Sequence, residues 1–384
     1  MDDDLRRALR NGAIAAVAAA IVGFSLDAAF SGGDGQPAAT GTPKPAAPTC
    51  MPMWETASSA DPDLGGNQLL GVSALSRNEV WAVGARGPAE APVATLVERW
   101  DGERWEVVAS ANVGTVANVL RAVDAMSADD AWAVGSTSSG GDDQPLILHW
   151  DGASWSASTV PYVTAGASLS GVVAVSRDDA WAVGSAGDKT LGLERAFALH
   201  WDGLSWTETT VPAGGGRSLL ASVGAASSND VWAVGYRQRR PLVMRFDGDT
   251  WAPVAIEATG ALSAVAVIAP DEIWAVGSSI WSWDGSSWTE SATIRGNGSL
   301  LGVAGASPDD VWAVGSRPAG GGTRALAERF GGRRWTLVAG RGVQGSDVFT
   351  SVAALPSGAV WMAGYSDTPK GRVTLVARRV RWCG

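Results

Sequence analysis

The tetrapeptide Trp-Ala-Val-Gly recurs along this chain and constrains the fold more than any other feature of the sequence. Six copies and one variant, Trp-Met-Ala-Gly, begin at Trp81, Trp132, Trp181, Trp232, Trp274, Trp312 and Trp361. Successive copies lie roughly 40 to 50 residues apart, and a repeat of this length is one supersecondary unit that cannot bury its apolar face alone. The sequence therefore predicts several copies of one small unit, packed against each other.

Each unit contains four short apolar runs separated by turn residues. In the third unit the runs begin at Leu169, Ala180, Ala196 and Trp206. Runs rich in Val, Trp, Thr and Leu, bounded by Gly, Asp and Ser, are typical of strands joined by hairpin turns. The pattern predicts an all-β fold, a seven-bladed β-propeller whose blades are four-stranded antiparallel sheets.

The tryptophans indicate how the ring closes. Most of the 20 tryptophans occupy repeated strand positions, and we expect Trp382 to end the third strand of the seventh unit. Trp54 precedes the first unit and is followed by Glu-Thr, much as Trp206 is followed by Thr-Glu. We therefore expect the N-terminal segment to supply the outer strand of the last blade, which leaves no free sheet edge at the seam.

The two cysteines agree with this closure. Cys383 is expected at the turn position that Asp202 holds, and Cys50 lies just upstream of Trp54. We predict a Cys50–Cys383 disulfide across the seam, which would stabilise the fold by up to roughly 5 kcal/mol through the denatured state. The alternative is a pair of unrelated thiols.

Residues 1–30 lie outside the repeat and are typical of an export segment. Arg6, Arg7 and Arg10 precede an apolar run over residues 12–26. This run is short for a spanning helix, and Ala29-Phe30-Ser31 is a passable cleavage site, so a signal anchor and a cleaved signal peptide both stay open. Residues 31–49 predict a flexible Gly/Pro/Ala linker and residues 50–384 the propeller. We expect an extracellular propeller at the cell membrane, or a secreted one, in a compartment that permits disulfides.

Charge and motif content exclude several classes of function. The net charge of −10 argues against a nucleic-acid partner. The sequence shows no paired carboxylates, no Ser/His/Asp spacing, no phosphate loop and no metal-binding cluster. We therefore assign no catalytic residue, no metal and no cofactor.

The histidines follow the repeat. His149 and His200 each precede a third-strand tryptophan, at a position that is Arg99, Arg245, Ser282, Arg329 and Arg381 in the other units. We expect this basic position to pair with acidic turn residues, such as Asp130, Asp179, Asp230 and Asp310. Trp281, which fits no repeated tryptophan position, is expected to pack in the core; the alternative is that it stacks on a ligand.

The turns and strands resemble known propeller families. The motif Asp-Gly-x-Ser/Thr-Trp, at residues 202–206, 247–251 and 284–288, resembles a shortened Asp-box of the sialidase-like (BNR) repeats. The Val-Trp-Ala-Val-Gly strand is similar to tectonin-type lectin propellers, and the closure resembles WD-type propellers. The likeness covers about residues 50–384 and implies the architecture. It does not imply sialidase chemistry, because no positions match the arginine triad and the tyrosine nucleophile of that family.

The loops that differ between units are the expected binding surface. They follow each Trp-Ala-Val-Gly or lead into each first strand, and propeller topology brings both sets to one face. Binding residues favour loops on a rigid scaffold. The candidate ligand contacts are Tyr162, Tyr236, Arg237, Arg239, Arg240 and Tyr365; the alternative is a solvated surface.

These observations predict an exported, membrane-tethered, monomeric and non-catalytic recognition module. Its partner would be an envelope glycan or an extracellular protein, and membrane contact would involve only the N-terminal segment. One alternative is an extracellular propeller glycosidase or lyase that acts on polysaccharide. Another is a scaffold that binds proteins only.

Overall fold

The computed structural model describes residues 50–57, 59–60, 65–87, 92–161, 166–188, 191–294, 297–338 and 346–383. The chain divides into two compact units, Met1–Pro48 and Thr49–Gly384, and the described residues all belong to the second. Among them, no helix is long and apolar enough to cross a membrane. The export segment and the linker predicted over residues 1–49 lie outside the described residues.

The second unit is built from seven four-stranded antiparallel sheets, which confirms the predicted propeller. In six sheets the strands are consecutive along the chain. The strands of the first three blades are β2 (Gln68–Ser76), β3 (Glu79–Arg86), β4 (Ala94–Trp100) and β5 (Trp105–Val107), β6 (Ala117–Ser127), β7 (Asp130–Ser138), β8 (Gln144–Trp150) and β9 (Trp155–Ala157), and β10 (Ser168–Ser176), β11 (Asp179–Ala186), β12 (Arg195–Trp201) and β13 (Trp206–Thr209).

Blades four to six follow the same order, and blade seven takes its outer strand from the N-terminal end of the unit. These strands are β14 (Ser218–Ser227), β15 (Asp230–Arg237), β16 (Arg240–Phe246) and β17 (Trp251–Pro253), β18 (Leu262–Ala269), β19 (Glu272–Gly277), β20 (Ser279–Trp283) and β21 (Trp288–Thr293), β22 (Ser299–Ser307), β23 (Asp310–Ala319), β24 (Gly322–Phe330) and β25 (Trp335–Leu337), and β26 (Ser346–Ala354), β27 (Val360–Thr368), β28 (Gly371–Cys383) and β1 (Cys50–Ala57).

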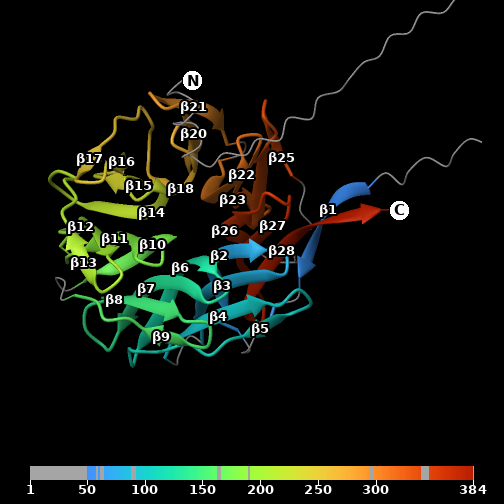
Figure 1. The fold of residues 1–384 in the computed structure, drawn as a ribbon. Helices are drawn as coiled ribbons and strands as arrows, with labels where there is room; N and C mark the ends of the chain where they lie inside the picture. The colour runs from blue at the N-terminus through green and yellow to red at the C-terminus, as the bar shows by residue number, and fades with distance from the viewer. Residues whose placement is uncertain are drawn as a thin grey trace, which may run out of the picture. The chain divides into compact units, whose positions relative to one another are not determined.

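The first strand of every blade faces the centre of the ring. These strands contact one another in a closed cycle, β2, β6, β10, β14, β18, β22, β26 and back to β2 (Figure 1). Each contains a one-residue register shift against its neighbour, for example between Leu169 and Gly171. Such a bulge redirects one side chain out of the pleat. The bulged residues therefore line the central channel, and they are Leu70, Arg121, Ser170, Ala221, Ser263, Leu301 and Thr350.

The same bulge explains the glycine that ends each Trp-Ala-Val-Gly. A Cβ atom on Gly184 would lie 1.9 Å from the carbonyl oxygen of Ser168 on the first strand. The corresponding distance is 1.9–2.2 Å at the equivalent glycine of every blade. Only a residue without a side chain fits beneath this carbonyl, so the glycine fixes the spacing between the first and second strands.

The tryptophan of the tetrapeptide packs between neighbouring blades. Trp181 is 1% exposed, and its ring lies 4.6 Å from Phe246 and 5.3 Å from Trp251 of the next blade. The equivalent tryptophans make the same kind of contact around the ring. Trp281 is 8% exposed and belongs to the core, which confirms its predicted packing role.

The predicted ion pairs of the basic position are present. The four pairs are His149–Asp130 at 2.9 Å, His200–Asp179 at 2.9 Å, Arg245–Asp230 at 2.7 Å and Arg329–Asp310 at 2.6 Å. The imidazoles also lie 4.2 Å from the rings of Trp132 and Trp181. Both histidines therefore have structural partners on their own blade.

The seventh blade differs from the prediction by three residues. Arg378, not Arg381, lies opposite Trp361 and pairs with Glu55 of β1 at 3.2 Å. Arg379, not Trp382, takes the aromatic position that ends the third strand elsewhere, and its guanidinium lies 5.6 Å from the Trp312 ring centroid. No Asp-Gly turn stops β28, so the strand continues along the whole length of β1.

The seam itself is closed as predicted, by β1 lying against β28 (Figure 1). Trp54 is opposite Arg379 and packs edge-on against Trp312 at 5.3 Å, as Trp251 packs against Trp181. Cys50 and Cys383 are paired in this register, so Cys383 lies in a strand rather than in the predicted turn. Their side chains lie outside the described part, and the disulfide stays a prediction.

The aspartates of the Asp-Gly turns accept hydrogen bonds from the backbone of the turn. Asp202 Oδ1 accepts hydrogen bonds from the backbone N–H groups of Leu204 at 2.9 Å and Ser205 at 2.8 Å. These bonds favour the charged form and lower the pKa of the Asp202 carboxyl. The turns at Asp101, Asp151, Asp247 and Asp284 have the same geometry.

One carboxylate joins the first strands of three blades. Asp124 on β6 accepts hydrogen bonds from the backbone N–H of Ala174 at 2.9 Å and from the Ser73 hydroxyl at 3.4 Å. Burial, only partly opposed by these bonds, raises the pKa of Asp124 from 3.8 to about 6. The folded protein therefore holds this proton over a pH range in which the unfolded chain has lost it.

We expect Asp124 to lower the stability of the propeller above pH 6. A carboxyl whose pKa is raised on folding adds stability below its unfolded pKa, and this stability is lost as the pH rises through the folded value. The loss should reach about 3 kcal/mol at most. Asp124→Asn keeps an acceptor for Ala174 and removes the charge. Urea unfolding at pH 4 to 8 should show the wild type losing stability relative to Asp124→Asn; parallel curves would contradict the account.

Candidate binding face

The variable loops emerge at one end of the propeller, here called the loop face. It carries the hairpin turns between the second and third strands and the connections between blades. The fourth blade contributes its hairpin, residues 236–240, and the preceding segment, residues 210–217. Four of the six residues predicted as ligand contacts lie in this hairpin.

The hairpin places three arginines in solvent. β15 ends at Arg237, β16 begins at Arg240, and the two-residue turn between them has positive φ at Gln238 (49°) and Arg239 (68°). This is the type I′ conformation, for which Asn-Gly is the usual sequence. Gln-Arg adopts it at a cost of order 1 kcal/mol or more for each residue, and such strain clusters at functional sites. The side chains of Arg237, Arg239 and Arg240 are exposed.

A glycine segment supports this hairpin from the side. Arg237 Nη1 donates a hydrogen bond to the carbonyl oxygen of Ala213 at 3.1 Å, and the Gln238 N–H donates to that of Arg217 at 2.8 Å. A Cβ atom on Gly214 would lie 2.3 Å from Arg237 Nη1. A side chain at that position would displace the end of the Arg237 side chain and break its bond to Ala213.

A buried carboxylate extends the cluster into the third blade. Glu194 is 5% exposed and pairs with Arg217, whose pKa is raised by this bond first and by Tyr236 second. The Ser218 N–H also donates to the carbonyl oxygen of Glu194 at 3.0 Å. Next to Glu194 lie Leu193, 65% exposed, and Leu191, 70% exposed. The segments thus form one continuous surface, called the arginine patch, of Leu191, Leu193, Arg217, Arg237, Arg239 and Arg240.

Two arginines of the patch have a side chain without a partner among the described residues. Arg217 binds Glu194, and Arg237 binds a carbonyl oxygen. The guanidinium groups of Arg239 and Arg240 form no ion pair with any described residue. On a chain of net charge −10 this is a local concentration of positive charge beside exposed apolar side chains.

The other predicted contacts lie elsewhere. Tyr365 is on blade seven, three blades away from Tyr236, and the Arg372 guanidinium lies 3.9 Å from its ring centroid. Arg372 is held in place by Asp367 and Gln68, both at 2.8 Å, so it covers one face of the tyrosine ring. Tyr162 lies outside the described residues.

The sequence did not identify Arg217, Leu191 or Leu193. Arg217 precedes a first strand, about 20 residues before the hairpin, and only the fold brings the two together. The signal that would have found it is the Gly-Gly-Gly-Arg run at residues 214–217, because three glycines before a strand indicate a close approach to another segment.

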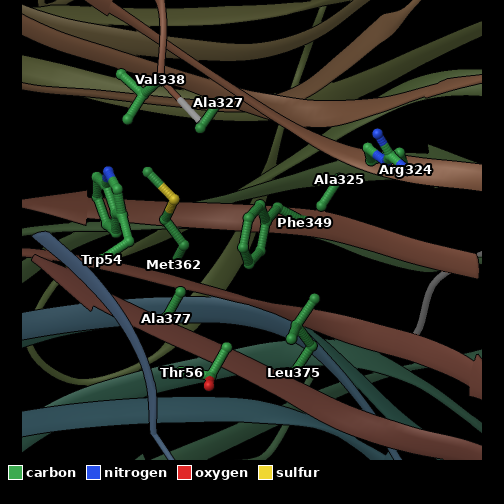
Figure 2. Close-up of a pocket in the computed structure, with 10 residues that line it drawn as sticks. All are labelled: Trp54, Thr56, Arg324, Ala325, Ala327, Val338, Phe349, Met362, Leu375 and Ala377. Atoms are coloured by element: carbon green, nitrogen blue, oxygen red, sulfur yellow. The ribbon is translucent and has the colours of Figure 1, made fainter. Parts of the chain in front are cut away.

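Two hollows in the described part of the surface do not resemble a catalytic cleft. A hollow of about 790 Å³ on the loop face of blade two is bordered by Val113, Gln144 and Pro161, and its one carboxylate is Asp142. An apolar cavity at the seam, lined by Trp54, Met362 and Phe349, measures about 30 Å³, the space of one water molecule (Figure 2). In the described part of the chain, no cluster of His, Cys, Asp or Glu could hold a metal ion.

Comparisons with known proteins identify the fold and not the family. No family model matches the chain, and no curated protein matches it. A solved structure of YCF48 bound to D1 peptide is similar at 17% identity and a TM-score of 0.55, over 85% of this chain and 96% of that one. YCF48 from Cyanidioschyzon merolae is similar at 18% identity and a TM-score of 0.53, over 85% and 98% of the two chains. At these identities the likeness shows a shared propeller fold.

Proposed function

We propose that this protein is a non-catalytic recognition module that binds a segment of a partner protein through the arginine patch. The observation that carries the proposal is the pair of arginines on a strained hairpin, without a partner among the described residues and flanked by exposed leucines. A propeller of the same fold, YCF48, has been captured with a peptide, so the architecture suits this role. We further propose that the module is exported and tethered to the membrane through its N-terminal segment.

The chemistry of the patch favours an acidic segment that also carries apolar side chains. A guanidinium binds a carboxylate through two parallel hydrogen bonds, which is stronger and more specific than a single charged contact. Contact of the exposed Leu191 and Leu193 with apolar side chains would remove apolar surface from water and so favour binding. Because the remaining surface is negative overall, the patch would also steer an acidic segment toward itself.

A protein partner is better supported than a glycan. Sugar sites usually present an open aromatic face, whereas the repeated tryptophans are packed between blades and Tyr365 is covered by Arg372. A glycosidase would need two carboxylates that converge in a cleft, and the hollow on blade two offers one. A hollow on blade one is bordered by Glu79, Asp101 and Glu106, but these carboxylates are bound by Arg99, by backbone N–H groups and by Arg104.

The test uses labelled twelve-residue peptides of alternating Glu and Leu, with a Lys-Leu peptide of the same length for comparison. We expect the Glu-Leu peptide to bind the full chain and the Lys-Leu peptide not to bind. Arg239→Glu combined with Arg240→Glu should weaken binding about tenfold or more, equivalent to about 1.4 kcal/mol. Fluorescence anisotropy at several salt concentrations measures both the affinity and its decrease with salt.

The matched control is Arg333→Glu combined with Arg334→Glu. These exposed arginines lie in the turn between β24 and β25, at the opposite end of the propeller. The control changes the net charge equally, so it should leave binding within about twofold of the wild type, a difference of about 0.4 kcal/mol. Equal losses in both variants would mean that net charge, and not the patch, attracts the peptide. Binding to a glycan array without binding to either peptide would favour the glycan alternative.

A further inference from the structure

One charged side chain lines the described part of the central channel at the level of the bulges. The bulged residues of the seven first strands all lie at the same level of the ring, and six of them are uncharged. The seventh is Arg121 of blade two, the one ionisable residue that lines this part of the channel. The space between these residues is about 160 Å³.

Arg121 has no partner in the described structure. Its guanidinium forms no ion pair or hydrogen bond with any described residue. The side chain is exposed to the channel, and the protein around it lowers its pKa. The negative charge of Asp143, in the hairpin loop of the same blade, raises the pKa of Arg121 and so partly opposes this effect. An exposed guanidinium without a bound anion offers its N–H donors to a ligand of opposite charge.

Hydroxyl groups line the channel at the same level. Ser170 and Ser263 hold bulge positions, and their hydroxyls make no hydrogen bond with described residues. The Ser222 and Ser351 hydroxyls accept hydrogen bonds from the backbone N–H groups of Val265 and Val72, both at 3.2 Å. Their own hydrogens stay available to a ligand, because a hydroxyl can donate and accept at once.

We propose that the channel binds a single carboxylate group, held by the guanidinium of Arg121 and by the hydroxyl of Ser170 on the neighbouring blade. One cation matches one monovalent anion, and the planar guanidinium matches a planar carboxylate. The volume equals that of about five water molecules, which limits the ligand to a small organic acid or to the end residue of a peptide. This site is separate from the arginine patch and does not depend on the function proposed for it.

The test compares the unfolding midpoint of the full chain in sodium chloride and in sodium acetate at constant ionic strength. A second arm compares tetra-alanine with a free carboxyl end against its amide. We expect acetate or the free peptide to raise the midpoint, because a ligand that binds only the folded state stabilises it. The arm that responds identifies the source of the carboxylate.

The decisive variant is Arg121→Leu, since leucine already occupies the same position in blades one and six. It should fold and bind the responding probe at least about tenfold more weakly, the loss expected for a hydrogen bond to a charged group. The control Arg333→Leu and the patch variant Arg239→Glu/Arg240→Glu should both respond like the wild type. The proposal is wrong if neither probe raises the unfolding midpoint of the wild type. It is also wrong if the responding probe raises the midpoint of Arg121→Leu equally.

Discussion

Trp181→Ala is expected to lower the free energy of unfolding by about 3–5 kcal/mol. The indole is 1% exposed and packs between two blades, against Phe246 and Trp251. Truncation removes this apolar contact and leaves a cavity, because strands fixed in two different sheets cannot both move inward. The measurement is equilibrium urea unfolding, followed by far-ultraviolet circular dichroism so that the lost fluorophore does not matter.

The control for this variant is Leu204→Ala on the same blade. Leu204 is 88% exposed in the turn between β12 and β13, so its truncation should change stability by no more than about 0.5 kcal/mol. If Trp181→Ala costs as little as the control, the packing of tryptophans between blades does not hold the ring together.

The second large effect is expected from Gly184→Ala, which adds a single methyl group. That methyl would lie 1.9 Å from the carbonyl oxygen of Ser168 and 2.9 Å from the Cα atom of Leu169, and both are backbone atoms. Backbone cannot rotate away as a side chain would, so the first strand must separate from the second. We expect a loss of about 3 kcal/mol, at the upper end for an overpacked site.

Gly141→Ala separates this steric effect from the general effect of replacing a glycine. Nothing lies within 4 Å of the position that its Cβ would take. Alanine there reduces the freedom of the unfolded chain and should stabilise the protein slightly, by about 0.4–1 kcal/mol. The two variants should therefore differ in sign. Similar midpoints in urea would show that the strand pair adapts to the methyl, and that the glycine is not required by the bulge.

The sequence predicted the ring because the information was repeated. Six copies and one variant of a tetrapeptide identified the blade, and the resemblance of Trp54 to Trp206 identified the closing strand. The seventh blade was misplaced by three residues because its third strand reads Arg-Arg-Val-Arg-Trp, and Trp382 matches the repeated aromatic better than Arg379 does. The position of this strand depends on the pairing of β28 with β1, which is a contact between the two ends of the unit.

Of the two candidate sites, the sequence predicted most of the arginine patch and missed the channel site. The hairpin arginines could be predicted because they interrupt a repeat at one place in the sequence. Arg121 could not, because a bulge position is visible only when strands are paired. A comparison of the residues that follow the leucine of each first strand would have shown one arginine among neutral residues, yet nothing in the sequence says that this position faces the channel.

The exchange of strands at the seam has a consequence for the connectivity of the chain. In six blades a short turn joins the third strand to the fourth, whereas in blade seven these two strands, β28 and β1, are the two ends of the unit. A four-residue turn of the Asp-Gly type could join them, and the chain could then be opened at the equivalent turn of another blade. The propeller is thus a candidate for circular permutation, with the turn between the third and fourth strands of any other blade able to become the new pair of ends.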